Sequence, residues 1–78
     1  MADGLLVIVP ALNEVRRIGG VLAGIRANAP AAALLVIDDG SRDETAREAR
    51  AAGAAVVVHP FNLGYGAALL TGYRYARA

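Results

Sequence analysis

The sequence predicts an α/β fold in which three parallel strands alternate with three helices, in the order β-α-β-α-β-α. Three short apolar runs, at residues 5–10, 33–37 and 54–58, are separated by segments with the apolar spacing of amphipathic helices. Each run is continuously apolar rather than alternating, which is typical of strands buried on both faces of a parallel sheet. We therefore expect an open, doubly wound, Rossmann-like half-sheet with helices on both faces.

The first strand is predicted over residues 5–10, LLVIVP, where the proline should stop the hydrogen bonding of the sheet. A helix is expected next, with Asn13 as its N-cap and Pro30 just beyond its end. Its apolar face is marked by residues spaced three or four positions apart: Val15, Ile18, Leu22 and Ile25.

The second strand is predicted over residues 33–37. Ser41 to Glu44 then spell S-x-x-E, a capping box that should start a helix running to about Ala52. Gly53 stands where a left-handed C-terminal residue is favoured.

The third strand is predicted over residues 54–58, and the last helix is expected to begin near Gly66. Its spacing places Ala68 or Leu69, Gly72 and Ala76 on one side.

Length and composition restrict the functional classes. The chain has 78 residues, 56% of them hydrophobic, which is little for a self-sufficient core without a staple, and it has no cysteine. We therefore interpret residues 1–78 as a single partial domain. All eight basic residues are arginines, so a P-loop or Schiff-base lysine is excluded. The basic and acidic residues are interspersed, which argues against nucleic-acid binding.

The apolar runs are too short to span a bilayer, which takes about 20 residues. The N-terminal MADGLL has no basic segment typical of a secretory leader. A cytoplasmic location is therefore expected.

Polar residues gather where the three strands end. The segments are PALNE after the first strand, DDGS after the second and HPFNLGYG after the third. Open parallel sheets bind ligands outside the carboxyl ends of their strands. We therefore expect a binding site formed by these three segments.

Asp38 and Asp39 leave two interpretations open. They could be turn formers between a strand and a helix, since aspartate before glycine and serine is common there. Alternatively, one contacts a ligand and the other braces the loop, because adjacent residues at a strand end point in opposite directions. The same geometry argues against a metal shared by the pair.

Other residues of these segments are less specific. Gly64 and Gly66 form part of a dinucleotide-binding fingerprint, but Leu69 stands where that motif needs glycine or alanine, so close backbone approach is the simpler interpretation. His59 is more simply structural than catalytic. Glu14 is explained equally by the helix dipole and by ligand binding.

Together, VIVPALNE, LLVIDDGSRDET and HPFNLGYGAALLTGYRYA resemble the N-terminal part of family 2 glycosyltransferases of the GT-A fold. The sequence is most similar to the branch of dolichol-phosphate mannosyltransferase and other polyprenyl-phosphate sugar transferases. The resemblance covers practically the whole chain.

The resemblance implies a site for a nucleotide sugar, linked to either UDP or GDP. Four residues would bind it: Pro10, Leu12, Glu14 and Asp39. Asp39 would accept a hydrogen bond from the base, and four other residues would support the site: Asp38, Ser41, Gly64 and Gly66. The family often has tyrosine where Leu12 stands, so a stacking contact is missing here.

The resemblance also implies a cofactor, Mg²⁺ or Mn²⁺, held by an Asp-x-Asp motif that lies outside these 78 residues, together with the acceptor site. We therefore expect no metal ligands and no catalytic residues in this chain, and no activity from it alone. A full-length protein would be an enzyme that transfers a sugar to an acceptor such as a polyprenyl phosphate, at the cytoplasmic face of a membrane.

Two other functions remain open. The chain could be a non-catalytic module that forms a homo-oligomer through the exposed edge of its sheet. It could also be a small doubly wound binding domain.

Overall fold

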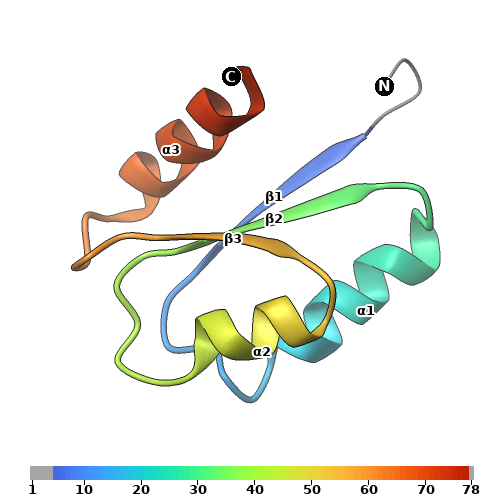
Figure 1. The fold of residues 1–78 in the computed structure, drawn as a ribbon, viewed down its shortest axis with the longest axis horizontal. Helices are drawn as coiled ribbons and strands as arrows, with labels where there is room; N and C mark the ends of the chain where they lie inside the picture. The colour runs from blue at the N-terminus through green and yellow to red at the C-terminus, as the bar shows by residue number, and fades with distance from the viewer. Residues whose placement is uncertain (1–4, 78) are drawn as a thin grey trace.

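The computed structural model describes residues 5–77 and confirms the predicted order of strands and helices (Figure 1). The strands are β1 (Leu6–Ala11), β2 (Ala33–Asp38) and β3 (Ala55–Val58), and the helices are α1 (Ile18–Asn28), α2 (Thr45–Ala51) and α3 (Tyr65–Arg77). β2 lies in the middle and pairs in parallel with both other strands. The prediction that no secretory leader is present was made from the N-terminal residues, and the first four of these lie outside the described residues.

The helices cover both faces of the sheet, as expected for a doubly wound arrangement. On one face, Ile18 and Leu22 of α1 and Ala49 of α2 form a core with Leu34 and Val36 of β2. On the other face, a single helix, α3, packs across β1 and β2. Figure 1 shows α1 and α2 on one side of the strands and α3 on the other.

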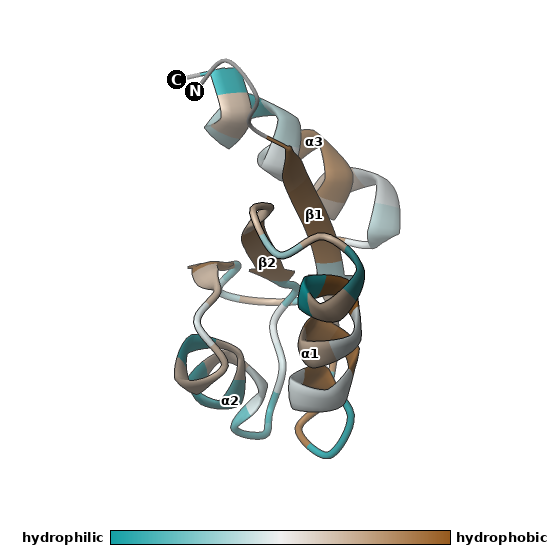
Figure 2. Cartoon of the chain, turned by 90° about the vertical axis from the view of Figure 1, so that its right-hand side faces the viewer, coloured by the Kyte–Doolittle hydropathy of each residue, from teal (hydrophilic) through white to brown (hydrophobic). Residues whose placement is uncertain are grey.

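The side chains of β2 show why a continuous apolar run predicts a strand that is buried on both faces. Leu35 and Ile37 point toward α3, whereas Leu34 and Val36 point toward α1 and α2. All four are buried, because helices cover both faces of this strand. Figure 2 shows β1 and β2 in the brown of hydrophobic residues, whereas the teal of hydrophilic residues lies on loops and helices.

The prediction that Pro10 ends the first strand is wrong. β1 continues for one more residue, to Ala11. The carbonyl groups of Leu5 and Ala11 accept hydrogen bonds from the second strand region, so the odd-numbered residues face β2. The nitrogen of Pro10 therefore faces the free edge of β1, where the missing N–H breaks no hydrogen bond of the sheet.

Both predicted N-caps are wrong. α1 begins at Ile18, after a turn in which the carbonyl of Glu14 accepts hydrogen bonds from the N–H groups of Arg17 and Ile18. Asn13 lies outside the helix with a positive φ of 53°. α2 begins at Thr45 without a side-chain cap from Ser41. Gly53, by contrast, has the predicted left-handed conformation, with φ of 93°.

No helix between residues 5 and 77 combines the length and the apolar character that crossing a bilayer requires.

The contact between α3 and β1 depends on a glycine. Gly72 is buried, and a Cβ atom at this position would lie 2.5 Å from Cγ2 of Ile8. Ile8 is β-branched and cannot easily turn this methyl group away. Gly72 therefore sets how closely α3 approaches the sheet, while the predicted neighbour Ala76 is exposed.

We predict that Gly72→Ala destabilises the chain. Overpacking costs about 1–3 kcal/mol, and the gain in helix propensity offsets up to about 1 kcal/mol of it. The matched control is Gly24→Ala in α1, where an added Cβ meets nothing within 4 Å, so stability should rise by about 0.5–1 kcal/mol. Urea unfolding measures both, and a Gly72→Ala variant as stable as the parent would contradict the close contact.

Candidate functional site

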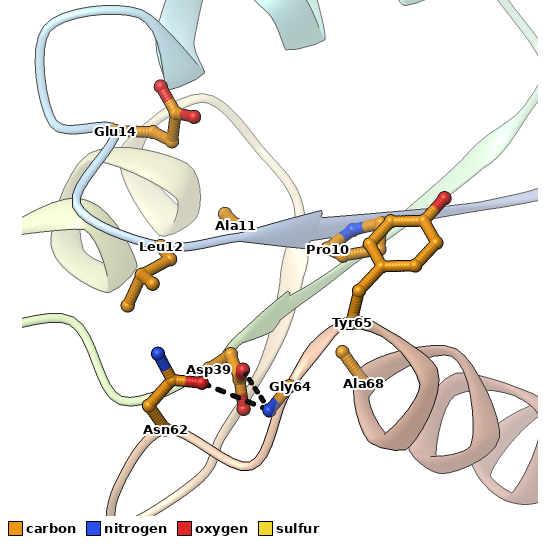
Figure 3. A pocket seen from close by; sticks show the side chains of 9 residues that line it. All are labelled: Pro10, Ala11, Leu12, Glu14, Asp39, Asn62, Gly64, Tyr65 and Ala68. Atoms are coloured by element: carbon orange, nitrogen blue, oxygen red, sulfur yellow. Dashed lines mark hydrogen bonds between the residues drawn. The ribbon is translucent and has the colours of Figure 1, made fainter.

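A pocket of about 310 Å³ lies at the carboxyl end of the sheet (Figure 3). The end of β1, the residue after β2, the loop before α3 and the first turns of α3 together form it. Its lining residues are Pro10, Ala11, Leu12, Glu14, Asp39, Asn62, Gly64, Tyr65 and Ala68. The structure therefore brings together all four residues that the sequence suggested for ligand binding.

The loop after β1 is held by the loop before α2. The backbone N–H of Asn13 donates to Oγ of Ser41 over 2.8 Å, and Oδ1 of Asn13 accepts from the N–H of Arg42 over 2.8 Å. The next N–H, of Glu14, donates to Oγ1 of Thr45 over 2.8 Å. These bonds connect residues far apart in sequence and hold Glu14 at the rim of the pocket. Ser41 thus bridges two loops instead of capping a helix.

Asp38 lies in the interior at the end of β2 and does not line the pocket. Its Oδ1 accepts a hydrogen bond of 3.0 Å from the backbone N–H of Ser41. This bond closes the turn around Gly40, whose φ is 83°. Asp38 and Asp39 therefore have separate environments, as the alternation of side chains along a strand suggests.

Asp39 is 5% exposed and organises the loop between β3 and α3. Its Oδ1 accepts from Nδ1 of His59 over 2.7 Å and from the N–H of Leu63 over 2.9 Å. Its Oδ2 accepts from the N–H of Gly64 over 2.8 Å. The carboxylate thus binds three donors of one loop while it lines the pocket.

Two opposing effects act on the pKa of Asp39. Burial raises the pKa of Asp39, but the hydrogen bonds from His59, Leu63 and Gly64 together outweigh burial and leave the pKa below the ordinary value of 3.8. The side chain is therefore ionised at neutral pH and acts only as an acceptor.

His59 joins Asp39 to helix α3. Its Nδ1 donates to Asp39, since a carboxylate can only accept, and its Nε2 lies 2.8 Å from Oγ1 of Thr71. An aspartate, a histidine and a hydroxyl in a row resemble a nucleophilic relay. However, His59 is buried, and neither His59 nor Thr71 lines the pocket. This row is therefore structural, in agreement with the simpler interpretation of His59.

Sequence reasoning placed the segment HPFNLGYG at the site but gave no role to Asn62 or Ala68. Asn62 lines the pocket because the loop after β3 folds back over Asp39, and Tyr65 and Ala68 line it from α3. Gly64, which the family resemblance implied as a supporting residue, donates to Asp39 from a left-handed conformation with φ of 100°. Gly66, by contrast, does not line the pocket.

Asp39 and Glu14 are the two carboxylates that line the pocket, and both have protein partners. Both oxygens of Asp39 already accept N–H donors, and Oε1 of Glu14 lies 2.8 Å from Nε of Arg17. Among residues 5–77, no three side chains of the ligating types gather at one point.

Comparisons with known proteins agree with the fold. The model of the family described as glycosyl transferase family 2 matches residues 6–78. An uncharacterised protein of Methanocaldococcus jannaschii is 39% identical over 74 residues, which are 95% of this chain and 30% of that protein. The 4,4'-diaponeurosporenoate glycosyltransferase of Staphylococcus aureus (strain USA300) is 49% identical over 53 residues, 68% of this chain and 14% of the enzyme.

Solved structures show the same arrangement. The glucosyl-3-phosphoglycerate synthase of M. tuberculosis superimposes with a TM-score of 0.72 at 33% identity, over 88% of this chain and 29% of the synthase. A second mycobacterial protein gives a TM-score of 0.68 at 36% identity, over 85% of this chain and 25% of its own. The chain spans less than a third of the length of each of these relatives.

We predict that Asp39 makes stability depend on pH in the acid range. Because its pKa is lowered on folding, its contribution is fully present above the ordinary value of 3.8 and is lost as the pH falls through the lowered pKa. At about pH 7, Asp39→Asn should reduce the free energy of unfolding by about 1.5–3 kcal/mol, the value of a hydrogen bond to a charged group.

This difference between parent and variant should shrink as the pH falls to about 3. Urea unfolding across this range measures it, with Glu48→Gln on the exposed face of α2 as the control. A difference that stays constant with pH would contradict the role of the Asp39 charge.

Proposed function

Because the chain belongs to glycosyl transferase family 2, we propose that its pocket binds the nucleoside diphosphate part of a nucleotide sugar. The observation that carries this proposal is the pocket at the carboxyl end of the sheet, where Pro10, Leu12, Glu14 and Asp39 meet. Ligands of open parallel sheets bind at this end. The rest of a larger enzyme would complete the sugar transfer.

The walls of the pocket suit a base. Pro10, Leu12 and Ala68 are apolar and can cover its faces, while Asp39 supplies a charged acceptor for a base N–H. Glu14 lies at the rim, where its exposed ion pair with Arg17 is weak enough to yield to a ribose hydroxyl. Each predicted binding residue thus has a chemical role in the proposal.

The metal and the acceptor site belong to the same proposal but to other residues. A divalent ion, Mg²⁺ or Mn²⁺, would offset the charge of the leaving diphosphate. By resemblance to the family, its ligands would come from an Asp-x-Asp motif outside this chain, as would the site for an acceptor such as a polyprenyl phosphate. The chain alone is then expected to bind nucleotide without transferring sugar. A cytoplasmic location, with membrane association of the whole protein, completes the proposal.

Self-association is a second candidate function, favoured by the sheet edges. Within the described residues, β1 and β3 each pair only with β2, so each leaves one edge open. Pro10 removes a donor from the β1 edge, which leaves β3 as the better template for a second copy. A concentration-independent monomer in sedimentation would exclude this candidate.

We predict that Leu12→Tyr strengthens nucleotide binding. Leu12 is an exposed wall of the pocket, and an aromatic ring there can stack on a base, a contact worth about fivefold or more in affinity. Calorimetric titration with UDP and GDP measures the change. The matched control is Leu70→Tyr, on the exposed side of α3 and away from the pocket.

A gain in affinity cannot result from misfolding, which makes this variant more decisive than Asp39→Ala. Asp39→Ala should lower affinity about tenfold or more, since it removes a charged acceptor. If Leu12→Tyr binds no better than Leu70→Tyr and neither variant nor parent binds nucleotide, the proposed function is wrong.

A further inference from the structure

The carboxylate of Asp39 has limited capacity left for a ligand. An ionised carboxylate offers about four acceptor positions, two on each oxygen. The donors from His59 and Leu63 occupy both positions on Oδ1, and the donor from Gly64 occupies one on Oδ2. Asp39 can therefore accept one further hydrogen bond, through Oδ2.

Asn62 provides a donor beside this acceptor. Its Oδ1 accepts from the N–H of Gly64 over 3.0 Å, and Oδ2 of Asp39 accepts from the same N–H. This bond orients the amide, so its Nδ2 group points away from Gly64, as Figure 3 shows. Within residues 5–77 this Nδ2 group makes no hydrogen bond. The pocket thus presents one acceptor on Asp39 and one donor on Asn62, two side chains that share the N–H of Gly64.

This pattern matches the edge of uracil. Uracil has a single ring N–H flanked by two carbonyl oxygens, so it needs one acceptor and has oxygens that can accept from Asn62. Guanine has a ring N–H next to an amino group, and a carboxylate binds both only when each of its oxygens has a free position. Oδ1 of Asp39 is already full, so the guanine amino group would lose its bond to the protein.

We propose that this pocket selects uracil over guanine, because Asp39 and Asn62 present one free acceptor and one donor. The inference rests on the proposed function and adds its substrate class, a sugar linked to uridine diphosphate. Thymine has the same edge with an added methyl group, so thymidine diphosphate belongs in the test.

The first experiment uses the unaltered chain and four nucleotides. NMR titrations with UDP, GDP, inosine diphosphate and thymidine diphosphate measure each dissociation constant, including weak ones. UDP should bind about tenfold tighter than GDP, the effect of about one hydrogen bond to a charged group. Thymidine diphosphate shows whether the added methyl group is tolerated. This distinguishes uracil from thymine, which have the same hydrogen-bonding edge.

Inosine diphosphate separates the two explanations, because its base is guanine without the amino group. It should bind at least as tightly as GDP if that group has no acceptor. If the carboxylate instead held both guanine donors, inosine diphosphate would bind about tenfold more weakly. That result, or GDP binding as tightly as UDP, would overturn the selectivity and leave the proposed function intact. Failure of all four nucleotides to bind would overturn both.

The second experiment changes the donor into an acceptor. Asn62→Asp keeps the oxygen that accepts from Gly64 but replaces Nδ2 with a second oxygen, which suits the guanine amino group. The ratio of UDP to GDP affinity should fall about tenfold or more. The control is Asn28→Asp, which adds the same charge at an exposed position outside the pocket and should leave the ratio unchanged. An unchanged ratio in Asn62→Asp would refute the proposal.

Discussion

The carboxylate of Asp39 is the interaction on which the site depends. It accepts donors from His59, Leu63 and Gly64, so one buried charge fixes both ends of the loop between β3 and α3. Burying a carboxylate is costly unless donors satisfy it, and here the loop supplies them. Placing the loop over the end of the sheet also creates one wall of the pocket. Stability and binding therefore rely on the same side chain.

The opposite wall is built by a different set of contacts. Ser41 and Thr45 accept hydrogen bonds from the backbone of the loop after β1. In the other direction, the side chain of Asn13 accepts one from the N–H of Arg42. Because Asp39, Ser41 and Thr45 all lie in the short segment after β2, this segment holds both neighbouring loops. A segment with so many bonds to its neighbours loses little further conformational entropy when a ligand binds.

Much of the fold follows from local pattern. Continuous apolar runs predicted three parallel strands, and helical spacing predicted that Ile18 and Leu22 lie in the core. The predictions that failed concern where one strand ends and which residues cap two helices. Pro10 was expected to end a strand, and Asn13 and Ser41 were expected to cap helices. Asn13 and the segment of Ser41 form hydrogen bonds with each other instead, and the missing N–H of Pro10 faces the open edge of the sheet. Local sequence pattern does not reveal either arrangement.

By itself, the sequence determined the fold class, the family motifs and the end of the sheet where Pro10, Leu12, Glu14 and Asp39 gather. These features depend on the order and spacing of residues, which govern which side of a strand or helix is buried. Only the tertiary structure decided what else shapes the pocket. The backbone N–H groups of Leu63 and Gly64 reach Asp39 across more than twenty residues, and Asn62 comes into the pocket with them. Such contacts arise from how segments pack rather than from any local preference. The remaining acceptor position of Asp39, and with it the base that the pocket suits, is set by that packing.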